Sequence, residues 1–193
     1  MPAPSSHQQQ SRDESDRVLL DRIVTGDREA FRELYIVYHR RLARFLTRLT
    51  RRYEFAEEII NDTMWVVWRR AGKFRGESRV STWIIGIAYR RALKSLKSRG
   101  QRQFDTMPIE HAPLVAPDEL GEAETTEWIL LGMQQLPPEQ RLALEFAYGH
   151  GHSCEEIAEI MNCPVNTVKT RLFHARAKLR ALLPGLAGAP PTM

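Results

Sequence analysis

Residues 153–182 read SCEEIAEIMNCPVNTVKTRLFHARAKLRAL, and this stretch decides the fold of the second half of the chain. Ser153 followed by Glu156 is a capping box, which predicts the start of a short helix. Residues 162–165 predict a tight turn, after which Asn166 is expected to cap a longer helix that Pro184 ends. The apolar stripe of this longer helix is spaced by fours and threes, at Val168, Leu172, Ala175, Leu179 and Leu182.

This order of elements matches the helix-turn-helix plan. Residues 164–193 hold five basic residues and no acidic ones, so no carboxylate interrupts the polar side of the longer helix. Arg and Lys reach phosphates and guanine edges, Thr forms hydrogen bonds, and an aromatic ring contacts the methyl group of thymine. A solvated basic helix packed on a small bundle is the simpler alternative, but the capped helix and turn before it favour DNA reading. The candidate DNA contacts are Asn166, Thr167, Lys169, Thr170, Arg171, Phe173, His174 and Arg176.

The first hundred residues predict a domain of four further helices, and no stretch of the chain is typical of a strand. Ser15 and Asp27 are expected to cap the first two helices, the third runs from about Glu54 to Ala71, and Ser81 or Thr82 caps the fourth. We therefore predict an all-α protein with two small helical domains. The expected boundaries are a disordered tail at 1–14, a first domain at 15–100, a linker at 101–121, a second domain at 122–184 and a second tail at 185–193.

The segment 73–102 combines basic and aromatic residues without a carboxylate after its first few positions. Such a mixture suits a separated DNA strand, because phosphates meet positive charge and unstacked bases meet aromatic faces. For Trp83, a place in the core and a place facing the bases are equally compatible with the pattern. The candidate residues are Phe74, Arg75, Ser78, Arg79, Ser81, Thr82, Trp83, Arg90, Arg91, Lys94 and Lys97.

Two other clusters could carry chemistry. Glu57, Glu58 and Asp62 share one side of the third helix, but no His, Cys or further acid accompanies them, so a docking face or plain solvation is favoured over catalysis. The four groups His150, His152, Cys154 and Cys163 lie within fourteen residues, yet their spacing is unusual for zinc, and we predict no metal site. The motifs GxGxxG, Walker A, GxSxG and HExxH are absent, so we predict neither an enzyme nor a cofactor or small-molecule substrate.

The charge is distributed unevenly along the 193 residues, whose formal net charge is +4. Residues 1–103 carry a net charge of +10, residues 104–163 one of −11, and residues 164–193 one of +5. Two basic blocks therefore flank an acidic one, and basic blocks are candidate footprints of nucleic acid. The two cysteines, the polar N-terminus and the lack of a long apolar run predict a cytoplasmic protein without membrane insertion.

With both domains in view, the chain resembles a sigma factor of bacterial RNA polymerase of the extracytoplasmic-function (ECF) type. The stretches GDREAFRELYIVYHRRLARFL, at 26–46, and EFAEEIINDTMWVVWRRAGKFRGESRVSTWIIGIAYRRALKSLK, at 54–97, are similar to sigma region 2. Residues 133–141 and 153–180 are similar to region 4. The resemblance covers about residues 17–184.

The resemblance implies a mechanism without bond chemistry, in which the protein binds core polymerase, brings it to a promoter and helps to open the duplex. It implies that Glu57, Glu58 and Asp62 dock on the β′ subunit, that residues 74–83 capture a base flipped from the minus-ten element, and that the last helix reads the minus-thirty-five element. It also implies contact with the β subunit and an anti-sigma factor that holds the two domains. A dimeric helix-turn-helix regulator acting without polymerase is the alternative.

Five positions depart from the common family pattern, at Tyr89, Arg90, Lys94, Asn166 and His174. All lie in the parts that the resemblance assigns to DNA reading, so they leave the promoter sequence open. His174 also suggests a hypothesis of pH-sensitive promoter binding, because an imidazole changes charge near neutral pH.

Overall fold

The computed structural model describes residues 6–50, 52–98 and 131–187, and within these ranges it contains helices and no strands. The first half consists of α1 (Ser6–Val24), α2 (Arg28–Thr50), α3 (Tyr53–Arg70), the short 3-10 turn η1 (Ala71–Lys73) and α4 (Val80–Ser98). The second half consists of α6 (Pro138–Leu144), the π-helical turn η2 (Glu145–Gly149), α7 (Cys154–Met161) and α8 (Val165–Ala187). The all-α prediction is therefore confirmed. The predicted linker at 101–121 lies outside the described residues.

Several of the predicted helix boundaries are confirmed by their capping contacts. Asp27 Oδ1 accepts hydrogen bonds from the backbone N–H groups of Glu29 and Ala30, which otherwise lack partners in the first turn of α2. Gly26, just before it, has a φ of +87°, a conformation that favours glycine at the end of α1. In α7 the capping box is complete, since the Ser153 hydroxyl accepts from Glu156 N–H and the Glu156 carboxylate accepts from Ser153 N–H.

Other predicted boundaries are wrong, and tertiary contacts explain the most informative of them. Helix α1 begins at Ser6, so residues 6–14 are not a disordered tail and Ser15 is not its cap. Helix α4 begins at Val80, and its cap comes from α1, because Asp13 Oδ1 accepts the Val80 N–H at 2.7 Å. Local propensity could not reveal a cap supplied from another helix.

At the other end of the chain, α8 begins one residue before Asn166 and continues past Pro184 to Ala187. Asn166 therefore lies inside the first turn instead of capping it. An interior proline removes one backbone hydrogen bond and disfavours a helix, but α8 includes Pro184 nonetheless.

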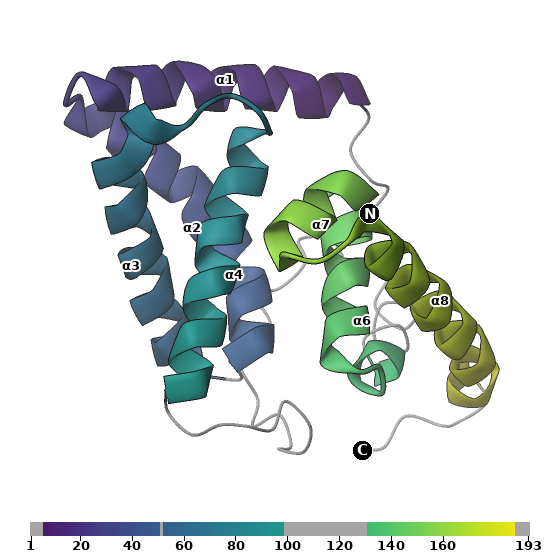
Figure 1. Cartoon of the computed structure of the whole chain (residues 1–193). Coiled ribbons are helices and arrows are strands. Elements are labelled where there is room, and N and C mark those ends of the chain that lie inside the picture. Colours follow the sequence, from purple (N-terminus) through teal and green to yellow (C-terminus); the bar gives the residue numbers. More distant parts are fainter. Residues whose placement is uncertain (1–5, 51, 99–130, 188–193) are drawn as a thin grey trace.

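Figure 1 shows α1 lying across one end of the bundle formed by α2, α3 and α4, with α6, α7 and α8 beside that bundle. The bundle exists because each helix buries an apolar stripe: Leu34, Tyr38, Phe45 and Leu46 of α2 are completely buried, as are Ile60 and Val67 of α3. Helix α7 packs against α4, so the two halves of the chain are in contact.

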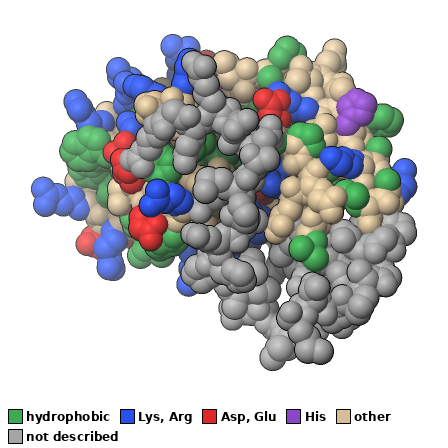
Figure 2. Space-filling model, turned by 90° about the horizontal axis from the view of Figure 1, so that it is seen from below, with side chains coloured by type: hydrophobic (Ala, Val, Ile, Leu, Met, Phe, Trp, Pro, Cys, Tyr) green, Lys and Arg blue, Asp and Glu red, His purple; other side chains and the backbone are tan. Residues whose placement is uncertain are grey.

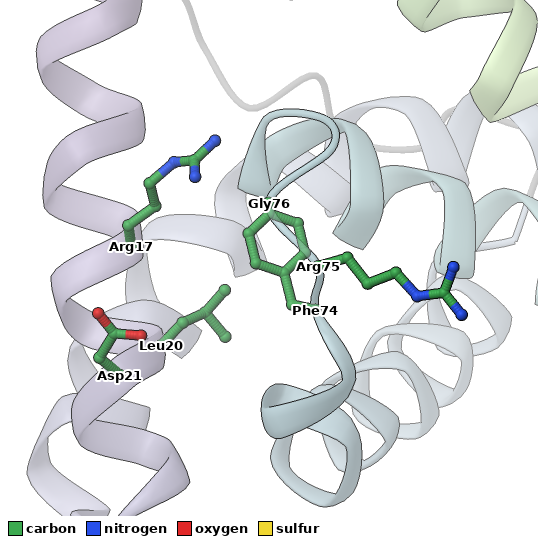
Figure 3. Close-up of a pocket in the computed structure, with 6 residues that line it drawn as sticks. All are labelled: Arg17, Leu20, Asp21, Phe74, Arg75 and Gly76. Atoms are coloured by element: carbon green, nitrogen blue, oxygen red, sulfur yellow. The ribbon is translucent and has the colours of Figure 1, made fainter.

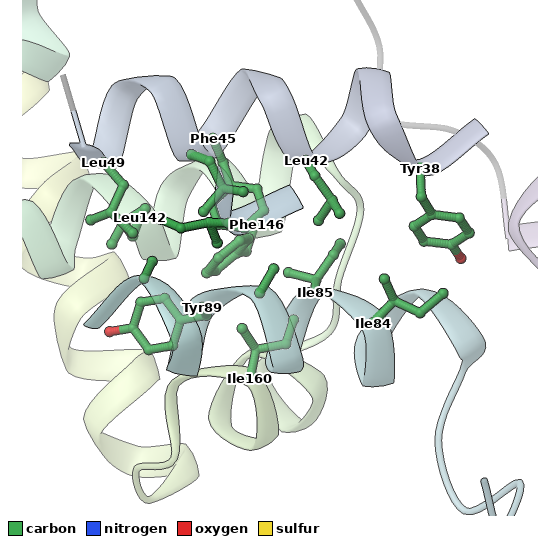
Figure 4. Close-up of a cluster of buried hydrophobic side chains, with 14 of the residues drawn as sticks. Tyr38, Leu42, Phe45, Leu49, Ile84, Ile85, Tyr89, Leu142, Phe146 and Ile160 are labelled. Atoms are coloured by element: carbon green, nitrogen blue, oxygen red, sulfur yellow. The ribbon is translucent and has the colours of Figure 1, made fainter. Parts of the chain in front are cut away.

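That contact is a continuous hydrophobic core (Figure 4). Phe146 of η2 is fully buried and points between α2 and α4, where its ring centroid lies 5.6 Å from that of Phe45 and 6.3 Å from that of Tyr89. The first and second halves therefore share one apolar core in this structure.

Candidate nucleic-acid interface

The first turns of α8 present a mixed polar and aromatic surface. Asn166, Lys169, Thr170 and His174 are exposed, and Phe173 is 67% exposed although it is a large apolar residue. Val168, Leu172 and Ala175 are buried against the rest of the second half, which fixes the face that α8 turns outward. The exposed face of α8 therefore carries hydrogen-bond donors and one aromatic ring, as the sequence predicted for a DNA-binding helix.

Two of the residues predicted to contact DNA are less exposed than the others. Arg171 forms an ion pair with Glu139 and donates a hydrogen bond to Cys163 Sγ at 3.4 Å. Thr167 is half-buried in the first turn. Arg176 is exposed, and its guanidinium lies over the ring of the exposed Tyr148, 5.6 Å from its centroid. The predicted contacts are thus on one helix, but Arg171 and Thr167 are less available than the others.

The loop between η1 and α4 holds the aromatic part of the second predicted surface. Phe74 packs on Trp83 with ring centroids 5.4 Å apart, and the Arg17 guanidinium of α1 lies over Phe74 at 5.7 Å. Trp83 is partly buried in this stack. Arg17, Leu20 and Asp21 of α1 line a hollow of about 210 Å³ together with Phe74, Arg75 and Gly76, and the Arg75 side chain points away from α1 (Figure 3).

Helix α1 holds this loop in place, a role that the sequence reasoning missed. Arg17 Nε donates to Asp13 Oδ2 at 2.7 Å, and Arg17 Nη2 donates to the carbonyl oxygen of Ser78 at 3.3 Å. The other oxygen of Asp13 accepts the Val80 N–H. A carboxylate and a guanidinium of α1 therefore fix the end of the loop and the start of α4. The D-x-x-x-R spacing at 13–17 predicts the ion pair between Asp13 and Arg17. It does not predict that this pair binds the backbone of Ser78 and Val80.

Three residues of the same predicted surface contact α7. Arg79 forms a two-point ion pair with the carboxylate of Glu156, and Thr82 Oγ1 donates to Glu156 Oε1 at 2.9 Å. Ser78 Oγ donates to Glu159 Oε1 at 3.1 Å. Burial on its own raises the pKa of Glu156, but His152, Arg79 and the Ser153 N–H outweigh it and hold that pKa well below its usual value.

The remaining predicted residues lie along the loop and α4. Arg75, Arg90, Lys94 and Lys97 are exposed, Ser81 is half-buried, and Arg91 donates to Asp62 at 2.6 Å. Figure 2 shows Lys and Arg side chains standing out around the edge of one face of the molecule, among a smaller number of acidic ones. These positions agree with an electrostatic footprint for a DNA backbone.

The acidic cluster on α3 is split by its contacts. Glu57 is held by His39, whose Nε2 lies 3.0 Å from the carboxylate, whereas Asp62 is 61% exposed and Glu58 is exposed. Trp65, one turn beyond Asp62, is 58% exposed. Tryptophan is one of the residue types enriched at protein interfaces. Trp65 was not among the residues that the sequence singled out.

The histidines and cysteines considered for zinc are not arranged around a common point. His150 and His152 stack with centroids 6.2 Å apart, and both cysteines are free. In the parts of the chain that the structure describes, no group of three or more His, Cys, Asp or Glu side chains is placed to hold a metal ion. Burial, followed by the charges of His152 and nearby arginines, lowers the pKa of His150 from 6.5 to about 3.

Within the described residues, no helix is long and apolar enough to cross a membrane.

Comparison with known proteins gives two family matches, one for each half of the chain. The family model described as Sigma-70 region 2 matches residues 34–102, and that described as Sigma-70, region 4 matches residues 126–179.

Curated relatives match over nearly their whole length. The RNA polymerase sigma-H factor of Pseudomonas aeruginosa is 33% identical over 189 residues, covering 91% of this chain and 98% of the relative. The ECF RNA polymerase sigma factor SigM of Mycobacterium tuberculosis is 35% identical over 169 residues, covering 88% and 85%. The ECF RNA polymerase sigma-E factor of Escherichia coli is 30% identical over 174 residues, covering 84% and 91%.

Solved structures share the fold. CnrH, in complex with the cytosolic domain of CnrY, is similar with a TM-score of 0.64 at 20% identity, covering 91% of this chain and 99% of that one. The sigma factor RpoE of Bartonella quintana, in complex with the anti-sigma factor NepR, is similar with a TM-score of 0.61 at 22% identity, covering 80% and 96%.

Proposed function

The chain belongs to the sigma-70 family as a sigma factor of the ECF type, and from this premise we propose which of its surfaces performs each step of initiation. The family is one of promoter-recognition factors and not of enzymes, and sigma factors act by binding core RNA polymerase and promoter DNA. The relatives support this function over that of a dimeric regulator acting without polymerase.

We propose that the first turns of α8 read the minus-thirty-five element. The observation that carries this assignment is the exposed row of Asn166, Lys169 and Phe173 on a helix that follows a capped short helix and a tight turn. A lysine reaches guanine edges or phosphates, an asparagine pairs with adenine, and a ring contacts the thymine methyl group. Recognition helices read bases from their N-terminal ends. Arg171 would have to leave Glu139 before it reached DNA.

The loop around Phe74 is our proposed site for the opened minus-ten strand. Phe74 and Trp83, whose rings pack at an angle of 47°, offer aromatic surface next to the hollow. Arg75, Arg90, Lys94 and Lys97 supply exposed positive charge for phosphates. Unpairing a base costs a few kcal/mol, which stacking and charge in such a pocket recover. In this function α1 keeps the loop in shape through Asp13 and Arg17.

The exposed part of α3 is our proposed contact with the β′ subunit. Glu58 and Asp62 present carboxylates there, and Trp65 adds a large exposed aromatic side chain to the same surface. Glu57 supports this face from within through His39. We further propose that the protein acts in the bacterial cytoplasm, makes or breaks no covalent bond, contacts the β subunit and is regulated by an anti-sigma factor.

The base-reading assignment is tested with holoenzyme reconstituted from this chain and core polymerase, on a promoter selected from a random library. Lys169→Ala is expected to weaken promoter binding by about 1–3 kcal/mol and to relax the preference at one base pair. Lys178→Ala, further along the same helix, is the matched control and is expected to weaken all sequences evenly or not at all. If Lys169→Ala weakened every sequence equally, Lys169 would be a phosphate contact and the assignment would be wrong.

A further inference from the structure

The proposed minus-ten surface is partly occupied by the chain's own acidic residues. We name Glu156 and Glu159 of α7 the acid pair. Glu156 binds Arg79 at two points and accepts from Thr82, and Glu159 accepts from Ser78. These are the guanidinium and hydroxyl donors with which a protein holds the phosphates of a DNA strand. The acid pair therefore offers carboxylate oxygens where DNA would offer phosphate oxygens.

The contacts of Glu156 with Arg79 and Thr82 are enclosed enough to exclude a competitor, whereas the Ser78–Glu159 contact is exposed. The Arg79 side chain is 22% exposed, that of Glu156 is 16% exposed, and Thr82 is 1% exposed. Arg79 Nη2 also donates to the carbonyl oxygen of Gly151 at 3.2 Å. A phosphate could reach Arg79 only after α7 had moved away from the start of α4.

We propose that the acid pair is an autoinhibitory clamp, which keeps the two halves of the free chain closed and excludes DNA from Arg79, Thr82 and Ser78. The proposal rests on the minus-ten role given above for these residues. It makes Glu156 a residue with two tasks, since the same carboxylate completes the capping box of α7.

The rest of the interface shows why the closed state persists until a partner opens it. Phe146 is buried between Phe45 and Tyr89, and Arg48 forms an ion pair with Glu145 at 2.8 Å, with only 4% of the Glu145 side chain exposed. Opening exposes this apolar surface to water, which is unfavourable. A partner that binds the separated halves more tightly than the closed pair shifts the population towards the open state. Core polymerase, which binds DNA-competent sigma factors, has the properties of such a partner.

The capping box makes a clean variant possible. Gln at the third helical position serves the capping box as well as Glu does, so Glu156→Gln removes the charge facing Arg79 while keeping the start of α7. Glu155→Gln removes one charge from the neighbouring, exposed position and is the matched control. Circular dichroism checks that both variants keep the helical content of the full chain.

The test compares wild type, Glu155→Gln, Glu156→Gln and the double variant Glu156→Gln/Glu159→Gln without polymerase, and Glu155→Gln is the control for Glu156→Gln because each removes one charge. Small-angle scattering measures the radius of gyration, and fluorescence anisotropy measures binding of a labelled single-stranded DNA 20-mer of randomised sequence. The proposal predicts a larger radius of gyration and about tenfold tighter DNA binding for the double variant. Adding Arg79→Ala to the double variant should abolish the gain in DNA binding. Glu155→Gln should behave as wild type apart from a small general effect of charge.

Two results would overturn the proposal, and they differ in what else they remove. If the double variant matched Glu155→Gln in both radius and DNA affinity, the clamp would be wrong and the proposed function untouched. If the double variant opened but bound DNA no more tightly than Glu155→Gln, DNA exclusion would be wrong together with the minus-ten role of Arg79.

Discussion

Acidification should weaken the contact between the two halves of the chain through His150. Its imidazole lies at the interface, with ring centroids 6.3 Å from Phe45 of α2 and 6.0 Å from Phe146 of η2, and it stacks on His152. Arg41, Arg44 and Arg48 of α2 lie on the side of the first half. Burial and these positive neighbours disfavour a charged imidazole, and the pKa of His150 is lowered from 6.5 to about 3.

The magnitude follows from proton linkage. Because the pKa is lowered by folding, the unfolded chain binds the extra proton between about pH 3 and pH 6.5, so stability is retained above pH 6.5 and lost as the pH falls below it. At pH 5.5 the native imidazole is still neutral, whereas the unfolded one is mostly charged. Going from pH 7.5 to pH 5.5 should therefore cost about 1.4 kcal/mol through this one group.

Urea unfolding followed by tryptophan fluorescence measures the effect, with His150→Gln as the reference protein. Burial raises the pKa of Glu145 despite the opposing Arg48 charge, which makes that group stabilising on acidification and masks part of the histidine effect. Both proteins contain Glu145, so its contribution cancels in the comparison. The wild type should lose about 1.4 kcal/mol more than His150→Gln between the two pH values. An equal loss in both proteins would refute the reasoning.

Three further changes test other parts of the structure. Phe146→Ala should destabilise the chain by about 3–5 kcal/mol in urea unfolding, because it empties the buried contact between Phe45 and Tyr89; a loss below about 1 kcal/mol would mean that the halves do not share this core in solution. Ser153→Ala should cost about 1 kcal/mol in the same assay through the cap of α7, and an unchanged midpoint would contradict the capping role. Asp13→Ala should speed amide hydrogen exchange at Val80, whose N–H loses its acceptor, whereas slow exchange at Val80 in the variant would show that α1 does not cap α4.

The helices with a clear apolar period could be predicted from the sequence because they bury a stripe within one domain. Helix α8 shows this best, since Val168, Leu172 and Ala175 are buried as its spacing indicates. The first turns of α1 have no such stripe. This segment is nevertheless helical, and its Asp13 and Arg17 bind Val80 and Ser78, which lie more than sixty positions away. Local sequence patterns do not encode such a contact.

The residue types of the proposed sites could be predicted from the sequence, but the contacts that these residues make with the rest of the chain could not. The residue types of α8 and of the loop around Phe74 indicated DNA, but several of them, among them Arg79, Thr82 and Arg171, contact acidic residues of the chain itself. Glu156 was interpreted only as a helix cap, because nothing in the sequence says that Arg79 lies opposite it. In the same way Arg171 looked like a free DNA contact, although its ion pair with Glu139 spans 32 positions of the chain.

Transcription from a promoter library tests the central claim most directly. Core RNA polymerase that is pure, active and free of other sigma factors is combined with the full chain on a library of random promoter sequences, and run-off transcripts are sequenced. The account predicts specific initiation from templates with two enriched elements, one near minus thirty-five and one near minus ten, and none without the chain. Active core that initiates no better with the chain than without it, on every template, would contradict the account.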